Sequence, residues 1–213
     1  MPQNSVDHWD QTYANKASEK LGWYESHPDT SLKLIAQCQL PAEARILIAG
    51  AGTSTLLDAL LAQGYQGLIA TDLSPVALSQ LQARLGPTAQ KVTWVVEDLR
   101  SGQALAPYQH QIDLWQDRAV LHFLIEEAER AAYLKLLKEL LKPGGFVILA
   151  CFAPGTAEKC SGLPVRQYSA ADLAQWLGPE FKGLDQREEV YTMPSGDTRL
   201  FTYVRFQRVS DHV

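Results

Sequence analysis

Two glycines and one aspartate are the residues of this sequence best placed to do ligand chemistry. Gly50 and Gly52 follow the apolar run Arg45 to Ala49, and Asp72 stands 20 residues after Gly52, at the end of a second apolar run. Glycine lets the backbone turn sharply and approach a bound molecule closely. A carboxylate at this distance is suited to accept hydrogen bonds from both hydroxyls of a ribose. The spacing therefore predicts a nucleotide-cofactor site, with Ala51 inside the turn.

The glycine turn lacks the third glycine of a dinucleotide-binding sequence. That glycine would stand three positions after Gly52, where this chain has Thr55. A Gly-x-Gly pair also occurs in ordinary strand-to-helix turns, and an aspartate after a strand often caps a helix. The strands and helices expected on both sides of the turn favour the ligand site over these alternatives. We expect the helix to begin near Thr53, so that its free N–H groups face the ligand.

Apolar runs and helical patterns alternate along the chain and predict the elements that position this turn. Buried strands are expected at 46–49, 67–71, 92–96, 112–116 and 146–152. Helices are expected after the glycine turn, after Ser74-Pro75, from Glu126 to Leu141, and from Ala170 to Leu177. The buried stripe of the helix from Glu126 is expected to consist of Ala128, Ala132, Leu136 and Leu140.

The end of the chain departs from this alternation. Two strand-like runs, Glu188 to Met193 and Arg199 to Gln207, flank the turn Pro194-Ser195-Gly196-Asp197 and predict a hairpin. Repeated β-α units imply a parallel sheet with helices on both faces. The sequence therefore predicts a doubly wound α/β fold with a mainly parallel seven-stranded sheet and an antiparallel C-terminal strand.

Size and composition bound the class of protein. The chain has 213 residues, of which 46% are hydrophobic, and no linker or repeat divides it, so a single domain over 1–213 is expected. No run of about 18 apolar residues could span a bilayer. The first residues, Met1-Pro2-Gln3-Asn4, lack the basic and apolar pattern of a signal segment. A cytoplasmic protein without a membrane partner is expected.

Cysteine usage and charge narrow the class further. The three cysteines are an odd count without a Cys-x-x-Cys pair, which argues against a disulfide framework and a zinc site. No clustered set of carboxylates and histidines is evident, so no metal is expected. The net charge of -5 disfavours nucleic acid as a partner, because binding to a phosphate backbone depends on a basic surface. The sequence does not indicate an oligomeric state.

The complete pattern resembles the class I S-adenosylmethionine (AdoMet)-dependent methyltransferases, which have a Rossmann-like fold. The motifs that carry this resemblance are Gly50-Ala51-Gly52, Asp72, Asp98-Leu99 and Leu141-Lys142-Pro143-Gly144-Gly145. The resemblance implies AdoMet as the cofactor, with the glycine turn under its methionine part and Asp72 on its ribose. It also implies that Asp98 and the Leu99 amide read the adenine edge. Leu73 and Gln116, beside the strand ends, complete the expected contacts.

One subgroup, the eukaryotic elongation-factor lysine methyltransferases, resembles this chain in more detail. Most class I members carry an acidic residue where this chain has Ile48, whereas that subgroup lacks it, as this chain does. The subgroup also has a Trp-Asp-x-x-Tyr segment like Trp9 to Tyr13, and a tryptophan where Trp23 stands. The resemblance implies that residues 1–40 fold over the cofactor while 41–213 form the core. The alternative is that these aromatic residues only pack a helix against the sheet.

The segment Trp115 to Phe123 follows the fourth expected strand, where a doubly wound sheet opens its ligand crevice. Asp117 would orient an acceptor amine or meet the cofactor ammonium, and Arg118 would bind the methionine carboxylate in bidentate fashion. Alternatively, Asp117 and Arg118 form a surface ion pair. His122 is a candidate base for a hydroxyl or thiol acceptor, or else a packed histidine. The segment lacks the Asn/Asp-Pro-Pro-aromatic motif of nucleobase methyltransferases.

These expectations converge on methyl transfer by in-line displacement to a nitrogen, oxygen or sulfur nucleophile. The acceptor favoured by the resemblance is a protein lysine, with a small molecule as the alternative. Residues 154–164, after the fifth strand, are either an acceptor-binding loop or a plain connection. A non-catalytic AdoMet-binding protein and a nucleotide-dependent oxidoreductase are the two rival classes.

Overall fold

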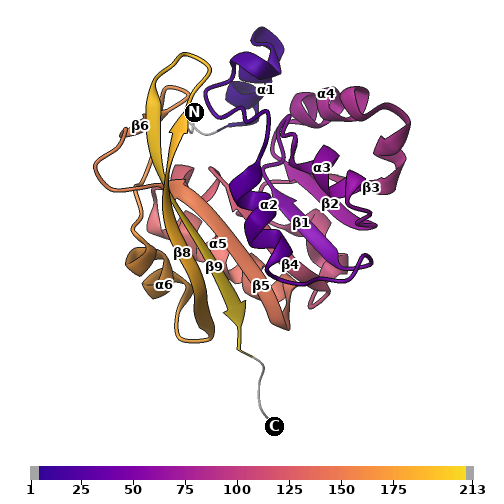
Figure 1. Cartoon of the computed structure of the whole chain (residues 1–213), viewed down its shortest axis with the longest axis vertical. Coiled ribbons are helices and arrows are strands. Elements are labelled where there is room, and N and C mark those ends of the chain that lie inside the picture. Colours follow the sequence, from indigo (N-terminus) through magenta and orange to yellow (C-terminus); the bar gives the residue numbers. More distant parts are fainter. Residues whose placement is uncertain (1–4, 210–213) are drawn as a thin grey trace.

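One seven-stranded sheet forms the centre of the computed structural model, which describes residues 5–209. The strand order is β3-β2-β1-β4-β5-β9-β8 (Figure 1). Strands β1 to β5 are parallel, and β9 is antiparallel to both of its neighbours. The predicted fold class is thereby confirmed. The strands are β1 Arg45–Ala49, β2 Gly67–Asp72, β3 Val92–Val96, β4 Ile112–Arg118, β5 Leu141–Phe152, β8 Phe181–Thr192 and β9 Thr198–Arg208.

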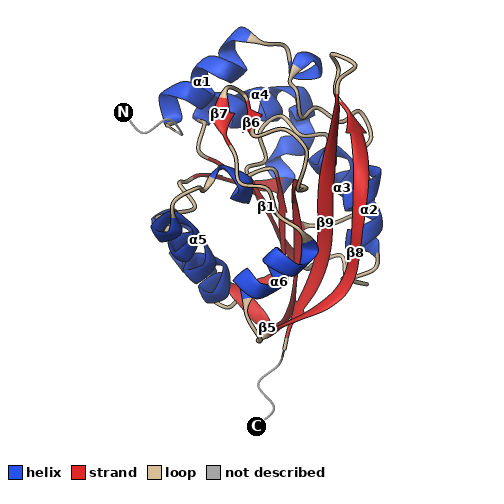
Figure 2. Ribbon diagram, turned by 90° about the vertical axis from the view of Figure 1, so that its left-hand side faces the viewer, coloured by secondary structure: helices blue, strands red, loops and turns tan. Residues whose placement is uncertain are grey.

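Helices cover both faces of the sheet (Figure 2). Apolar side chains of α5 and α6 pack on one face, and those of α2, α3 and α4 contribute to a second core on the other. Helix α1 lies at the end of the sheet where the parallel strands finish (Figure 1). The helices are α1 Val6–Asn15, α2 Asp29–Ala36, α3 Leu56–Ala62, α4 Pro75–Leu85, α5 Glu127–Leu140 and α6 Ala170–Leu177.

Local sequence explains where two of these helices begin. Ser74 is the N-cap of α4, where its hydroxyl accepts a hydrogen bond from the Ala77 amide at 3.1 Å and Pro75 takes the first helical position. Ser169 caps α6, and the Ser169 amide donates a hydrogen bond to the Asp172 carboxylate at 2.8 Å. Both starts agree with the sequence prediction. Between β5 and α6, strands β6 Lys159–Cys160 and β7 Leu163–Pro164 form a small hairpin that the sequence did not indicate.

Several predicted boundaries are wrong. Helix α3 begins at Leu56 rather than near Thr53, because the residues between them form an irregular turn. Strand β5 begins at Leu141 rather than at Phe146, so it includes the Lys-Pro-Gly-Gly run between the expected helix and the expected strand. Strand β8 begins at Phe181, seven residues before the predicted run, because its polar outer face conceals the strand pattern.

The predicted stripe of α5 is only half right. Leu136 and Leu140 are buried, but Ala128 is exposed and Ala132 is partly exposed. The buried face instead begins at Tyr133, because only the C-terminal part of α5 packs on the sheet. Among residues 5–209, no helix has both the length and the apolar character needed to cross a bilayer. The expectation about a signal segment rested on residues 1–4, which lie outside the described range.

Candidate functional site

Two neighbouring cavities lie at the end of the sheet where β1, β2 and β4 finish. They have volumes of about 770 Å³ and 560 Å³ with their open mouths included, which is the size range of small-molecule sites. Trp23, Gly50 and Arg118 line both, so the cavities adjoin at the glycine turn. The first cavity extends over the ends of β2 and β3. The second lies behind the glycine turn, against Pro28 and Ser31 at the start of α2.

Every residue that the sequence singled out for cofactor contact lines at least one of these cavities. The first cavity contains Trp9, Tyr13, Trp23, Gly50, Asp72, Leu73, Asp98, Leu99 and Arg118. The second contains Trp23, Gly50, Ala51, Gly52, Gln116 and Arg118. Residues as far apart in sequence as Trp9 and Arg118 therefore meet at one place. Their contact with a cofactor stays a prediction, whereas their convergence is a property of the fold.

The glycine turn is shaped by the protein's own packing. Gly50 and Gly52 have φ angles of +60° and +51°, which favour glycine. A Cβ at Gly50 would lie 2.1 Å from Val120 Cγ2, and one at Gly52 would lie 2.4 Å from the Tyr13 hydroxyl. The N–H groups of the turn are also engaged, since Ala51 donates to the Thr71 carbonyl at 2.8 Å. The predicted helix start near Thr53 is wrong, because α3 begins at Leu56, whose amide donates to the Ser54 hydroxyl at 3.1 Å.

Asp72 holds the glycine turn to the start of α4. Its Oδ2 accepts from the Gly52 amide and its Oδ1 from the Ser74 amide, both at 2.8 Å. Each carboxylate oxygen can accept two hydrogen bonds, so both keep capacity for a ligand in the first cavity. Burial raises the pKa of Asp72 to about 6, although the two backbone amides oppose this. The carboxylate is thus ionised at neutral pH.

Arg118 is the residue most firmly held at the junction of the cavities. Its Nε donates to the Tyr203 hydroxyl at 2.9 Å and lies 3.1 Å from Glu25 Oε2, while Nη1 donates to the Trp23 carbonyl at 3.0 Å. Its Cζ lies 4.6 Å from the centre of the Phe201 ring. The Nη2 atom is buried and has no hydrogen-bond partner within residues 5–209. An oriented guanidinium with an unused nitrogen suits an anionic group.

Asp117 points to the opposite face of β4 from Arg118, because neighbouring side chains alternate along a strand. Asp117 is fully buried and accepts hydrogen bonds from the amides of Val120 and Leu121 at 2.9 and 3.0 Å, and from the Tyr133 hydroxyl at 2.5 Å. Burial raises its pKa to about 6. It lines neither cavity, so the structure assigns it to shaping the turn after β4. The alternative of a surface ion pair with Arg118 is wrong.

His122 is also inside the protein. It is fully buried, and its ring lies 4.5 Å from that of Phe123 and 4.7 Å from that of Phe152, centre to centre. Burial lowers its pKa to about 3, so the imidazole is neutral at physiological pH. It lines neither cavity. The geometry agrees with the packed histidine rather than with the candidate base.

The aromatic residues of the N-terminal segment do two things at once. Helix α1 is attached to α4, since the Ser74 hydroxyl donates to Asp10 at 2.5 Å and the Gln80 amide donates to the Tyr13 carbonyl at 2.9 Å. The Trp9 ring lies 5.0 Å from that of Phe123, centre to centre, and both rings line the first cavity. The N-terminal segment therefore packs a helix against the end of the sheet and also forms part of the wall of the first cavity. The two alternatives drawn from the sequence do not exclude each other.

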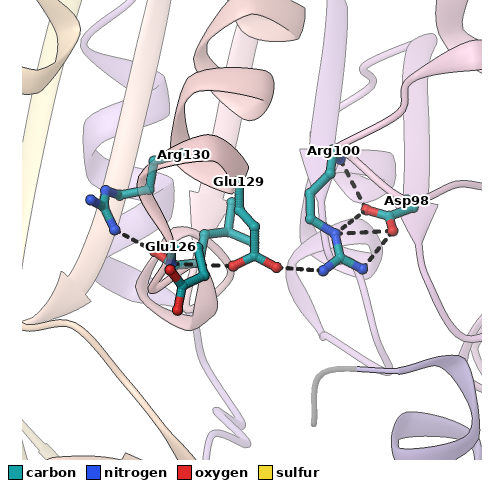
Figure 3. Close-up of polar contacts among 6 residues, drawn as sticks. Asp98, Arg100, Glu126, Glu129 and Arg130 are labelled. Atoms are coloured by element: carbon teal, nitrogen blue, oxygen red, sulfur yellow. Dashed lines mark hydrogen bonds and ion pairs between the residues drawn. The ribbon is translucent and has the colours of Figure 1, made fainter. Parts of the chain in front are cut away.

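Asp98 has a partner that the sequence analysis did not consider. Its carboxylate binds Arg100 side-on, with Nη2 2.6 Å from Oδ2, and Arg100 Nη1 reaches Glu129 Oε1 at 2.6 Å (Figure 3). Arg100 lines the first cavity, and Glu129 belongs to the first turn of α5. These hydrogen bonds lower the pKa of Asp98, although burial opposes the effect.

Some residues of the first cavity were indicated only through the segments that contain them. Ala119, Val120 and Phe123 belong to the segment expected at the ligand crevice, and Cys160 lies in the 154–164 segment that was open as an acceptor-binding loop. Tyr133, which lies 16 residues after Asp117 on a helix, had no signal in the sequence and reaches the cavity only through the tertiary fold. The other members that were not predicted are Glu97, Arg100 and Leu124. Within the described range, no cluster of three or more potential metal ligands was found.

Comparison with known protein families identifies the central part of the chain. Residues 47–147 match a family described as a methyltransferase domain. They extend from β1 into β5 and include the glycine turn, Asp72 and the segment after β4. This part of the chain, slightly less than half of it, is therefore similar to a methyltransferase domain, in agreement with the resemblance expected from the sequence.

Two kinds of relatives support this identification. Mouse EEF1A lysine methyltransferase 4 is 32% identical over 97 residues, which are 45% of this chain and 37% of that protein. The chain spans little more than a third of that relative. A SAM-dependent methyltransferase from Anabaena variabilis superimposes with a TM-score of 0.77 at 16% identity, covering 95% of this chain and 94% of the other. The N-methyltransferase NodS from Bradyrhizobium japonicum, solved with S-adenosyl-L-homocysteine, has a TM-score of 0.67 at 16% identity and coverages of 95% and 99%.

Proposed function

We propose that this methyltransferase domain binds AdoMet across the two adjoining cavities and transfers its methyl group to a nucleophile that enters the first cavity. The observation that carries the proposal is that Asp72 and Arg118 both line the cavities around the glycine turn. Asp72 has free acceptor capacity in the first cavity, and Arg118 has a buried Nη2 atom without a hydrogen-bond partner among the described residues. A ribose needs acceptors and a carboxylate needs donors, so this donor set fits the ligand.

The residues of the second cavity suit the amino-acid end of the cofactor. Arg118 would bind the carboxylate through Nη2, since its other nitrogens are engaged by the protein. Gln116 is only 2% exposed and lines the second cavity, and its side chain makes no hydrogen bond within residues 5–209. Its amide can donate and accept, so it suits a zwitterion. Glu25, paired with Arg118, supplies the counter-charge on the same wall.

The chain's contribution to the reaction is proposed to be binding, orientation and exclusion of water. When bound, AdoMet supplies a methyl group on a sulfonium with a good leaving group, so the protein need not provide strong acid or base catalysis. Trp9, Tyr13 and Trp23 wall the first cavity and would place aromatic faces near a cation, an attraction of about 0.5 to 2 kcal/mol. Asp117 and His122 lie outside the cavities, and we propose no proton transfer through them.

For the acceptor, a protein lysine is the first candidate. Its support is the similarity to EEF1A lysine methyltransferase 4 together with the aromatic N-terminal segment. A small-molecule acceptor is the second candidate, and a specific observation favours it. Aromatic side chains, among them Trp9, Tyr13 and Phe123, line the first cavity, and this apolar surface suits a compact acceptor.

The proposal is tested by incubating the protein with methyl-labelled AdoMet and a cell lysate, followed by separation into protein and small-molecule fractions. Label recovered as methyl-lysine supports the first acceptor, and label in metabolites alone supports the second. Binding without transfer to either pool would indicate a non-catalytic AdoMet-binding protein. A thermal shift with NAD(H) and none with AdoMet would overturn the proposal in favour of an oxidoreductase, since a ligand at 100 times its Kd stabilises by about 2.7 kcal/mol. The variant Asp72→Asn serves as the control, because its first cavity lacks the Asp72 carboxylate.

A further inference from the structure

We propose that Asp10 is a positioning residue for the cofactor, because it fastens helix α1 over the first cavity through Ser74 and thereby slows release of the ligand. The inference rests on the proposed cofactor function. It concerns a polar contact between α1 and the start of α4, two helices that lie side by side at the end of the sheet (Figures 1 and 2). Asp10 itself lines neither cavity, so it acts through the residues that it holds.

Helix α1 has little apolar contact of its own. Among its residues 6–15, only Tyr13 is buried. Tyr13 forms a small cluster with Leu21 and Ala77, against which the partly buried Trp9 packs, and this cluster is separate from the two cores on the faces of the sheet. A helix with so few buried apolar contacts opens at a low cost in free energy unless polar contacts hold it. The attachment of α1 therefore depends on its hydrogen bonds to α4.

Asp10 provides a charged hydrogen-bond acceptor for this attachment. Its Oδ1 accepts from the Ser74 hydroxyl at 2.5 Å and from the Val76 amide at 3.4 Å, so a negative charge lies at the N-terminus of α4. A hydrogen bond to a charged acceptor is about twice as strong as a neutral one. A second bond between the helices, from the Gln80 side-chain amide to the Tyr13 carbonyl at 2.9 Å, is neutral. The Asp10 carboxylate is therefore the stronger of these two attachments.

Ser74 connects this attachment to the cofactor site. Ser74 is fully buried, and its amide donates to Asp72 Oδ1 at 2.8 Å while its hydroxyl donates to Asp10. The carboxylate proposed to hold the ribose and the carboxylate that holds α1 are thus bound to one residue. Coupling between two sites is reciprocal, so a ligand that binds more tightly when α1 is docked also strengthens the docking of α1.

The docked helix places two aromatic side chains at the first cavity. Trp9 and Tyr13 stand four positions apart, on the same face of α1, and both line the cavity. The Tyr13 hydroxyl reaches the glycine turn, where a Cβ on Gly52 would lie 2.4 Å from it. A ligand that extends from Asp72 to the glycine turn is therefore covered by α1, and it leaves faster when α1 is detached.

Surface plasmon resonance with S-adenosyl-L-homocysteine at pH 7.5 tests the inference. Burial raises the pKa of Asp72 to about 6, so Asp72 stays ionised at this pH when the neighbouring charge of Asp10 is removed. In Asp10→Ala the release rate should rise at least about tenfold, because a charge-assisted hydrogen bond is lost. Asp10→Asn keeps an oxygen acceptor without the charge, so its release rate should rise at least about threefold, and this variant decides the test if the alanine variant does not fold. The matched control is Asp7→Ala, which should release the ligand as the wild type does, because Asp7 is exposed on the same helix and lines neither cavity.

Amide hydrogen exchange separates positioning of the cofactor from plain stabilisation of the helix. In the free protein, exchange of residues 6–15 should be faster in Asp10→Ala than in the wild type, while exchange of β4 and β5 stays unchanged. Unchanged exchange of α1 would contradict the inference, because Asp10 would then not fasten the helix. A release rate within about twofold of the wild type in the folded variants would overturn it even if α1 exchanges faster. The cofactor proposal would survive both results, whereas a wild-type protein that does not bind S-adenosyl-L-homocysteine would overturn both proposals.

Discussion

Replacing Asp72 by asparagine separates its structural and ligand-binding roles. In the structure each carboxylate oxygen accepts one backbone amide at 2.8 Å, from Gly52 and from Ser74. Asparagine keeps one acceptor and turns an NH₂ group toward the other amide, so one buried N–H loses its partner. The expected loss in the free energy of unfolding is about 1 to 3 kcal/mol. The ligand loses one charge-assisted hydrogen bond, worth about 1.5 to 3 kcal/mol, which corresponds to roughly 10- to 150-fold weaker binding.

The assay is isothermal titration with S-adenosyl-L-homocysteine at pH 7.5, where wild-type Asp72 is ionised. Thermal unfolding of the same sample reports the structural effect separately. Asp58→Asn is the matched control, because Asp58 lies on α3, has a side chain that is 41% exposed and, among residues 5–209, pairs only with Arg84. Its affinity should equal that of the wild type. A folded Asp72→Asn protein that binds within twofold of the wild type would remove Asp72 from the ligand site.

The pH dependence of binding is a second test of the role of the Asp72 carboxylate. The pKa of Asp72 is raised to about 6 by burial, so affinity should fall by up to about tenfold per pH unit below pH 6 and level off above pH 7. The contribution of Asp72 to the stability of the free protein has the opposite sign. A carboxyl with a raised pKa holds its proton more tightly in the folded state, so this contribution is present near pH 4 and is lost as the pH rises through 6. In Asp72→Asn, the pH dependence of binding should disappear.

Three further substitutions probe the site and its supports. Arg118→Leu should weaken binding of S-adenosyl-L-homocysteine by roughly 10- to 150-fold. It should also lower the free energy of unfolding by about 3 to 5 kcal/mol, because Glu25 loses its buried partner. An affinity equal to that of the wild type would contradict the proposed carboxylate site. Tyr133→Phe removes a hydrogen bond to Asp117 and should lower the free energy of unfolding by about 1 to 3 kcal/mol in urea titrations, with a smaller effect refuting the buried network. Gly50→Ala should destabilise by more than about 1 kcal/mol in the same assay because of its φ of +60° and the contact with Val120, and wild-type stability would show that the turn relaxes.

Much of the fold was predictable because buried strands leave continuous apolar runs. Strand β3 and helix α6 match the predicted boundaries residue for residue. The predicted strand boundaries were wrong where polar residues continue a strand. Strand β8 lies at the sheet edge and alternates in exposure, so only its last residues resembled a strand. The last two residues of β4, Asp117 and Arg118, were missed because they are polar, although both continue the pairing with β5.

The candidate site was predictable to the extent that it lies at strand ends. Residues directly after β1, β2 and β3 share one edge of the sheet whatever their partners are, so the glycine turn, Asp72 and Asp98 were brought together as expected. Their partners were not predictable, because the contacts of Arg118 with Tyr203 and of Arg100 with Glu129 join segments 85 and 29 residues apart. Only the fold shows that Asp117 and His122 line neither cavity, and for His122 this agrees with the packed alternative that the sequence left open.

A crystal structure of the complex with S-adenosyl-L-homocysteine tests the central claim most directly. The account predicts electron density for the ribose against Asp72, for the amino-acid end beside Arg118 Nη2, and for the purine beside Asp98 and Leu99 in the first cavity. Density for the ligand elsewhere on the protein, or both cavities remaining empty at saturating ligand, would contradict it.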